Sequence, residues 1–261
     1  MPASRVEIQL SITSAPCGTF RAQNGEDRWL DRYFKGRQAG FFVEVGAFDG
    51  VSLSNTYHFE QIGWTGILIE PDPDNAAQCR AHRPRSRTFE CAVVAPEATG
   101  EVAFFKVSGG TVYSTTSFTA AHRKRLLAGG YQWREVRVPA RTLDSILQEA
   151  AAPRLDFVTI DVEGGELQVL RGFDIRRWKP RAVVVESNAK RRDPAVRDYF
   201  VRNAYAYHHS IDVNDFYLPA GARWARASDS MRYLGHLFCR RLARLAHLGL
   251  RAWNRHVLRN Q

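Results

Sequence analysis

The apolar segment FFVEV at residues 41–45 contains one acid, and two glycines follow it. Glu44 precedes Gly46, and Gly50 closes the turn. The glycines let the backbone turn tightly and approach a ligand, and Glu44 places an anion at a strand end, where α/β folds hold their ligands. The turn lacks the G-x-G-x-x-G pattern that a pyrophosphate needs, and an acid attracts a cationic ligand instead. A turn that binds nothing is the alternative interpretation.

A second acid, Glu70, ends the apolar segment GILIE at 66–70 and precedes Pro71. A carboxylate in this place can accept two hydrogen bonds from the vicinal hydroxyls of a ribose. A solvated acid at a strand end is the simpler alternative. Because Glu44 and Glu70 end successive strands with a glycine turn between them, we expect the two acids to flank one nucleoside.

A third group of acids closes the apolar segment LDFVTI, where the sequence continues as DVEGGE from 161 to 166. Asp161 and Glu163 are placed to accept a proton from a hydroxyl group or to hold a divalent metal. Asp161 is the first candidate for the base and Glu163 the second. The alternative for Glu163 and Glu166 is a place in the first turn of a helix, where they stabilise the helix dipole.

Three further residues compete for these roles. His208 and His209 are rival bases because an imidazole titrates near neutral pH, although a histidine in a strand more often packs or faces solvent. Glu186 ends the segment AVVVE and can face an acceptor or a metal, or form a structural salt bridge. The sequence leaves the use of a metal such as Mg²⁺ undecided.

Strand-like segments alternate with helical segments from residue 41 to residue 187, which predicts βαβ units and a largely parallel sheet. We expect one helix from Asp74 to Ala81 and another at TLDSILQEA, with Asp144 at or near its cap. Two segments around Val213 and Asn214 predict a terminal antiparallel hairpin. The strands are expected at 41–45, 66–70, 87–94, 101–107, 134–140, 155–161, 182–187, 204–210 and 215–220.

A polar stretch at residues 108–133 separates two of these strands, and a long interruption of this kind is typical of a lid or a substrate loop. Tyr113, Thr115 and Ser117 can stack on sugar rings or form hydrogen bonds with them. The successive cations at 123–125 can hold a phosphate or a carboxylate. A solvated basic loop is the alternative.

The 261 residues are 44% hydrophobic, enough to bury one sizeable core, and no linker divides the chain into comparable halves. The four cysteines lie far apart without the spacing of a zinc site, which indicates reduced thiols in a cytoplasmic protein. We expect neither a signal peptide nor an apolar run of about 18 residues that would span a membrane.

Much of the net charge of +10 lies in residues 229–261, which hold seven arginines and one acid and so contribute +6. Leucines recur there at helical spacing, and a basic amphipathic helix predicts contact with an anionic membrane surface or a partner. Docking of this helix on its own domain is the alternative. The arginines cluster in this segment, and no N-P-P-Y motif follows residue 160. Nucleic-acid binding and RNA methylation are therefore weaker interpretations than methylation of a small molecule.

From about Gln23 to Leu218 the chain resembles the FkbM-type S-adenosylmethionine-dependent methyltransferases. The resemblance implies a class I methyltransferase fold, a Rossmann-like α/β sheet that is mostly parallel, with an antiparallel terminal hairpin and helices on both faces. It also implies S-adenosylmethionine as the donor and O-methylation of sugars or secondary metabolites. Six pieces in order support it, the last being the most specific: QNGEDRWL at 23–30, FFVEVGAFDGVSLSNTYHFE at 41–60, GILIEPDP at 66–73, ECAVV at 90–94, RTLDSIL at 141–147 and DFVTIDVEGGELQVLRGFD at 156–174.

The resemblance also assigns parts of the cofactor to positions in the chain. Glu44, Gly46 and Ala47 would line its methionine part, and Glu70 would hold its ribose. Phe48 departs from the Asn often found in this glycine loop. Further cofactor contacts are expected at Asp49, Asn55, Pro71, Asp161 and, near the adenine, Cys91 and Ala92, and acceptor contacts at Asn24, Glu26, Tyr113, Thr115, Ser117 and Glu186.

Three regions are therefore expected: an N-terminal extension at 1–40 that caps the cofactor or acceptor side, a methyltransferase domain at 41–220 with the insertion 108–133, and a basic helical tail at 221–261. The predicted enzyme methylates a hydroxyl of a sugar, glycolipid or polyketide-like acceptor in the cytoplasm, with the tail on the inner face of the membrane. A non-catalytic cofactor-binding scaffold is a further alternative, and a homodimer stays open.

Overall fold

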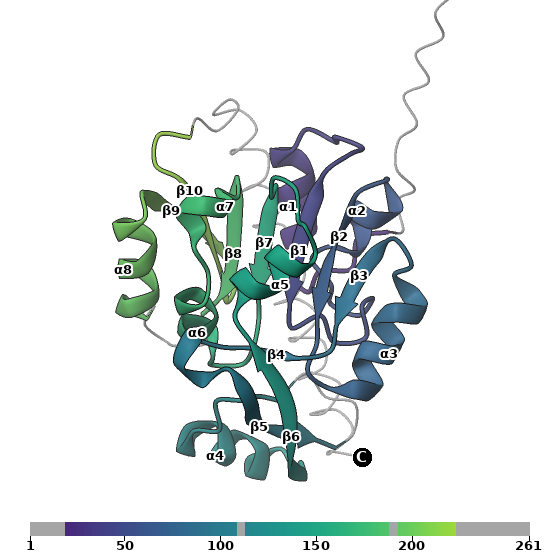
Figure 1. The fold of residues 1–261 in the computed structure, drawn as a ribbon, viewed down its shortest axis with the longest axis vertical. Coiled ribbons are helices and arrows are strands. Elements are labelled where there is room, and N and C mark those ends of the chain that lie inside the picture. Colours follow the sequence, from purple (N-terminus) through teal and green to yellow (C-terminus); the bar gives the residue numbers. More distant parts are fainter. Residues whose placement is uncertain (1–18, 109–112, 188–192, 223–261) are drawn as a thin grey trace, which may run out of the picture.

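The computed structural model describes residues 19–108, 113–187 and 193–222. Within these ranges the chain forms one large sheet with helices on both faces and a smaller sheet beside it (Figure 1). No helix in these ranges is long and apolar enough to cross a bilayer. The predicted membrane contact of residues 229–261 and two of the cysteines, Cys17 and Cys239, fall outside the described residues.

Seven strands make the large sheet: β1 (Phe41–Val45), β2 (Thr65–Ile69), β3 (Ser86–Phe89), β7 (Phe157–Ile160), β8 (Ala182–Glu186), β9 (Tyr205–Ile211) and β10 (Asn214–Pro219). Their order is β3-β2-β1-β7-β8-β10-β9. The first five of these are parallel, and β10 pairs antiparallel with both β8 and β9. This arrangement confirms the fold class predicted from the sequence, including its terminal hairpin.

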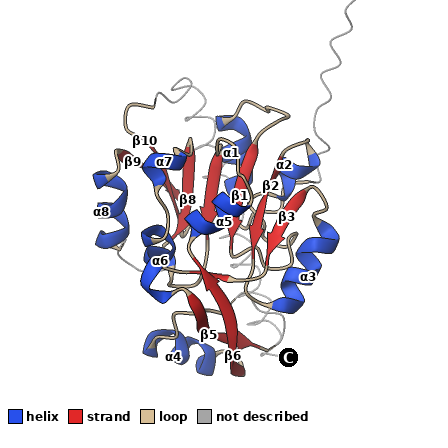
Figure 2. Ribbon diagram, in the orientation of Figure 1, coloured by secondary structure: helices blue, strands red, loops and turns tan. Residues whose placement is uncertain are grey.

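Four of the parallel strands, β1, β2, β7 and β8, are apolar along nearly their whole length because helices cover both faces of the sheet (Figure 2). In β1, Phe42 packs on one face with Trp64 and Phe157, while Val43 and Val45 pack on the other. The first face is covered by α1 (Glu26–Tyr33), α2 (Tyr57–Gln61) and α3 (Pro73–His82), and the second by α5 (Leu143–Glu149), α6 (Glu166–Arg171), α7 (Ile175–Trp178) and α8 (Pro194–Arg202).

The segment 87–94, predicted as one strand, is two strands in different sheets. β3 ends at Phe89, and β4 (Ala92–Val93) pairs in parallel with β6 (Trp133–Arg141). β5 (Gly100–Val107) runs antiparallel to β6, so the small sheet has the order β4-β6-β5. The chain leaves the large sheet at 90–91, and hydropathy alone did not reveal this break because apolar residues continue after it.

The insertion at 108–133 contains a helix, α4 (Ala120–Ala128). The Thr119 side chain caps its first turn by accepting a hydrogen bond from the amide of His122. Before the helix the chain folds back, and a β-bridge joins Thr115 to Phe105 of β5. The insertion therefore packs against the small sheet rather than forming a separate loop.

Asp144 lies near the start of α5 as expected, but the cap itself is Thr142. The Thr142 side chain accepts a hydrogen bond from the amide of Ser145. The Asp144 carboxylate instead accepts hydrogen bonds from the amide of Asp174 and the indole of Trp178. Both residue types suit a helix start, and the tertiary contact with α7 decides which one caps.

The bend after β1 depends on backbone conformations that few side chains allow. Gly46 has φ +86°, and a Cβ there would lie 1.8 Å from the backbone oxygen of Asp161. Phe48 has φ 51°, in the left-handed region that Gly and Asn adopt more readily than Phe. The departure from Asn at position 48 therefore has a conformational cost.

Substitutions of Phe48 show whether the positive φ or the apolar side chain has the larger effect on stability at this position. Asn tolerates a positive φ, whereas β-branched Val does not. We expect Phe48→Asn to be more stable than Phe48→Val by about 1 kcal/mol, and thermal unfolding followed by circular dichroism measures the difference. A more stable Val variant, which its apolar side chain alone would favour, would contradict the conformational argument.

Candidate functional site

A cavity opens at the carboxyl ends of β1, β2, β7 and β8. These ends share one edge of the sheet because Val45 pairs with Ile69 on one side and with Ile160 on the other. The small sheet contributes Phe104 to the wall, and the N-terminal helix α1 contributes Glu26. The cavity thus occupies the place where open α/β sheets bind their ligands.

The cavity brings together most of the residues predicted from the sequence. Fourteen of them line it: Glu26, Glu44, Gly46, Ala47, Asn55, Glu70, Pro71, Cys91, Ala92, Tyr113, Thr115, Asp161, Glu163 and Glu186. Four of the predicted site residues are not among its lining, Asn24, Asp49, Ser117 and His208, and neither is His209, the other rival base.

Three of these outlying residues support the walls of the cavity. The Asp49 carboxylate accepts backbone hydrogen bonds within the loop that follows the bend. The Ser117 amide donates to the hydroxyl of Thr115, and the Asn24 amide donates to the carboxylate of Glu26. Their contacts in this structure are therefore with lining residues and loop backbone.

The fourth, His208, lies on β9 with its ring 5.6 Å from that of Trp29. Its Nδ1 is 2.8 Å from Nδ1 of His209, whose ring stacks on Phe216. Burial lowers the pKa of both histidines, so they are neutral at pH 7. These contacts suit packing, and the candidate bases inside the cavity are the acids.

Glu70 follows the tip of β2 and is buried. Its Oε2 accepts a hydrogen bond from the amide of Phe48 and its Oε1 one from the amide of Asp72, both at 2.9 Å. The Asn75 side chain also donates to this carboxylate, and the lone pairs that these three bonds leave can accept from a ligand. Burial raises the pKa of Glu70 to about 8, and hydroxyl donors from a ligand would stabilise its carboxylate form. This one side chain ties the bend after β1 to the turn after β2.

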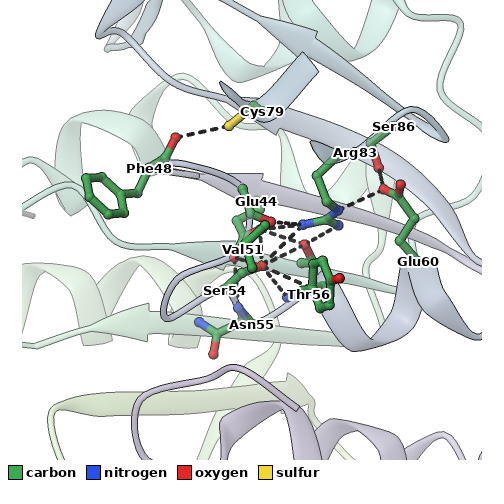
Figure 3. A network of polar contacts seen from close by, with 12 residues as sticks. Glu44, Phe48, Val51, Ser54, Asn55, Thr56, Glu60, Cys79, Arg83 and Ser86 are labelled. Atoms are coloured by element: carbon green, nitrogen blue, oxygen red, sulfur yellow. Dashed lines mark hydrogen bonds and ion pairs between the residues drawn. The ribbon is translucent and has the colours of Figure 1, made fainter. Parts of the chain in front are cut away.

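Glu44 is also buried, and its oxygens already have partners. The hydroxyls of Ser54 and Thr56 donate to it at 2.9 and 2.6 Å, and the amide of Asn55 donates at 2.9 Å (Figure 3). The carboxylate thus holds the segment 54–56 against the sheet. Figure 3 shows the Asn55 carboxamide turned away from this network, and its Oδ1 is buried with no hydrogen-bond partner among the described residues.

Three acids meet where β7 and β8 end. One carboxylate oxygen each of Asp161, Glu163 and Glu186 lies within 4.8 Å of the others. Burial, and then the Asp161 charge, raises the pKa of Glu186. Burial also raises the pKa of Asp161, and the hydrogen bond from Glu186 acts against that rise. Glu186 therefore keeps a proton at neutral pH and shares it in a hydrogen bond with Asp161.

Glu163 connects this acid cluster to the insertion. Arg125 of α4 lies 3.2 Å from the Glu163 carboxylate and 4.3 Å from the centre of the Tyr113 ring. The Thr115 hydroxyl donates to the backbone oxygen of Glu163 at 3.0 Å. Burial, and then the Asp161 charge, raises the pKa of Glu163 to about 7. The predicted lid thus reaches the site through an ion pair and a hydrogen bond.

Sequence reasoning missed several residues that the fold brings to the cavity. Asn214, at the start of β10, donates to Glu26 at 2.9 Å, although the two are far apart in the chain. Its place in a predicted hairpin was the only signal. Thr159 and Asp212 also line the cavity. Among the described residues that line the cavity, seven are acids and one is a cation: Glu26, Glu44, Glu70, Asp161, Glu163, Glu186 and Asp212, against Arg125.

Comparison with known proteins agrees with the resemblance seen in the sequence. The chain is 28% identical over 154 residues to the 2-O-methyltransferase NoeI of Sinorhizobium fredii (strain NBRC 101917 / NGR234), a match that covers 55% of this chain and 61% of that relative. The chain thus spans less than two thirds of the relative's length.

Solved structures also align with this chain. A precorrin-6Y C5,15-methyltransferase from Geobacter metallireducens GS-15 has 9% identity and a TM-score of 0.44 over 80% of this chain and 94% of its own. An O-methyltransferase from Bacillus cereus in complex with S-adenosylhomocysteine has 11% identity and a TM-score of 0.38 over 78% and 82% of the two chains.

A family model also matches this chain, over most of the described residues. The model of the methyltransferase FkbM domain matches residues 44–208, from the acid near the end of β1 to the middle of β9. This range contains the glycine bend, Glu70 and the acid cluster. The chain therefore belongs to the FkbM methyltransferase family.

Proposed function

We propose that this protein binds S-adenosylmethionine and transfers its methyl group to a hydroxyl oxygen of a sugar, glycolipid or polyketide-like acceptor. The proposal rests on one cavity that joins the Glu70 carboxylate, the bend at Gly46 and the Asp161–Glu186 pair. Membership of the FkbM methyltransferase family supports methyl transfer. Similarity to a 2-O-methyltransferase supports oxygen as the acceptor atom.

The donor lies along the ends of β1 and β2 in this proposal. Glu70 accepts hydrogen bonds from the ribose hydroxyls, and the Asn55 carboxamide oxygen accepts one from the amino group of the methionine part. Cys91 and Ala92 lie beside the adenine. Burial raises the pKa of Cys91 to about 11, so its thiol stays neutral and offers an apolar wall to the base.

The acceptor lies beside the acid cluster. Methyl transfer from a sulfonium is an in-line displacement, so the protein mainly holds the acceptor oxygen about 3 Å from the methyl carbon and excludes water. The O–C bond forms as the C–S bond breaks, and the hydroxyl proton passes to Asp161. Glu186, through the hydrogen bond that it shares with Asp161, keeps that carboxylate oriented.

The charge of the cavity supports a neutral acceptor over nucleic acid. Seven acids and one cation line it within the described ranges, and even with some acids protonated this wall repels phosphates. That cation, Arg125, is already paired with Glu163. RNA methylation therefore stays the weaker alternative.

The proposal includes a divalent metal, which can be tested separately from the donor site. The oxygens of Asp161, Glu163 and Glu186 are hard ligands of the kind that Mg²⁺ prefers, and they lie within 4.8 Å of one another. A cation there would take the place of the proton that Glu186 shares with Asp161. We expect dialysis against EDTA to abolish methyl transfer and Mg²⁺ to restore it. Full activity after EDTA treatment would remove the metal from the proposal, and the hydroxyl proton would then pass to Asp161 without one.

Glu70 gives the most direct test of the donor site. We expect Glu70→Ala to weaken S-adenosylhomocysteine binding by about tenfold or more, as loss of a charge-assisted pair of hydrogen bonds should. Isothermal titration calorimetry measures it, with Glu90→Ala as a control because Glu90 is an exposed acid after the neighbouring strand. Since Glu70 also holds two backbone amides, thermal unfolding is recorded alongside. Unchanged affinity in the folded Glu70→Ala variant would remove Glu70 from the site.

Asp161 tests the acceptor side. A general base contributes about 10²–10⁴-fold, so Asp161→Asn should lower kcat by that factor. Because only the carboxylate accepts a proton, kcat of the wild type should fall as pH drops through the raised pKa of Asp161, and the Asn variant should lack this acidic limb. The measurement is methyl transfer to a panel of sugars, glycolipids and polyketides across pH. An unchanged kcat in the variant would place the base elsewhere, and donor binding without transfer to any acceptor would favour a scaffold.

A further inference from the structure

Arg83 follows the last turn of α3, and its side chain is fully buried. It is not among the residues that line the cavity. Its Nε donates to Glu60 at 2.9 Å, and its two Nη atoms donate to the backbone oxygen of Gly50 at 2.8 Å and to the hydroxyl of Thr56 at 2.9 Å (Figure 3). Nη1 also lies 3.8 Å from Oε2 of Glu44. One guanidinium thus joins β1, the loop after it, α2 and α3.

Arg83 is the charge partner of two buried acids. Glu44 is 4% exposed and Glu60 is 2% exposed, and a carboxylate taken out of water is costly unless a cation compensates it. Burial raises the pKa of Glu44, and the Arg83 charge is the largest influence that opposes the rise. Without Arg83 these two anions would be buried without their cation.

The same guanidinium fixes the loop at residues 50–56. Gly50 has φ +79°, and a Cβ there would lie 3.0 Å from Cγ of Arg83, so the loop backbone packs directly on this side chain. Nη1 also donates to the Ser54 hydroxyl at 3.3 Å, and that hydroxyl donates to Glu44. Ser54 and Asn55 of this loop line the cavity. The contacts of Arg83 therefore reach the donor half of the site, which is the part of the cavity at the ends of β1 and β2.

We propose that Arg83 is a positioning residue for the donor half: it holds Glu44 and the loop 50–56 in the arrangement that binds S-adenosylmethionine, without touching the donor itself. This inference rests on the proposed donor binding. The hydrogen bonds and ion pairs of Arg83 go to β1, the loop 50–56 and α2, and none goes to Asp161 or Glu186 at the ends of β7 and β8. Loss of Arg83 therefore acts on donor affinity more than on the KM of the acceptor.

Titration with S-adenosylhomocysteine tests the inference on the wild type, Arg83→Met, Arg83→Lys and the control Arg80→Met. Arg80 lies on the same helix but is exposed, and it pairs with the exposed Glu90. We expect Arg83→Met to weaken binding by about tenfold or more and Arg83→Lys to weaken it less, because Lys keeps the charge but lacks the planar fork of donors. Arg80→Met should bind as the wild type does.

A second pair of variants separates positioning from folding. In Arg83→Met/Glu60→Gln one of the uncompensated acids is gone, so the Tm should recover in part while donor affinity stays low. Thr56→Val removes the hydroxyl that lies between Arg83 and Glu44 with almost no change of shape, and it should weaken S-adenosylhomocysteine binding in a folded protein.

Different results would overturn the role of Arg83 and the proposed function. Wild-type affinity in folded Arg83→Met or in Thr56→Val would overturn the inference. Recovery of affinity together with Tm in the double variant would also overturn it, because Arg83 would then act through stability alone. If the wild type and the Arg80→Met control both fail to bind S-adenosylhomocysteine, the proposed function fails and this inference with it.

Discussion

The register of β1 against β2 and β7 is the constraint on which the rest of the site depends. The Gly46 amide donates to the backbone oxygen of Ile69 at 2.9 Å, and the Asp161 amide donates to that of Val45 at 3.0 Å. These bonds continue the two ladders past the strand ends, so the glycine bend emerges beside Glu70 and Asp161. A slip of one residue would turn every side chain to the opposite face and separate the acids.

Burial then adds a second constraint, because the buried acids at this edge, Glu44, Glu70 and Glu186, must each be compensated. Backbone amides of two turns hold Glu70, and hydroxyls of one loop hold Glu44. At the third position a proton shared with Glu186 replaces a cation beside Asp161. These three ways of compensating an acid have different chemical consequences. Glu70 and Glu44 order backbone around a ligand, whereas the shared proton stabilises the carboxylate form of Asp161, which is exposed to the cavity.

The sequence predicted the sheet and located the cavity because strand ends in a parallel sheet can be found from short apolar segments and the acids and glycines beside them. It did not reveal where the chain leaves the sheet after Phe89, since apolar letters continue through β4. Contacts between distant segments were hidden as well, as with Asn214 and Glu26. Arg83 stands in the run HRPRSR, which is typical of a solvated surface, and only the fold shows that its side chain is buried.

A crystal structure of the protein with S-adenosylhomocysteine tests the central claim, that the edge formed by β1, β2 and β7 binds a nucleoside. The account predicts ribose hydroxyls within hydrogen-bond distance of the Glu70 carboxylate, the adenine beside Cys91 and Ala92, and the sulfur directed toward Asp161. A ribose bound away from Glu70, or a nucleoside outside this cavity, would contradict it.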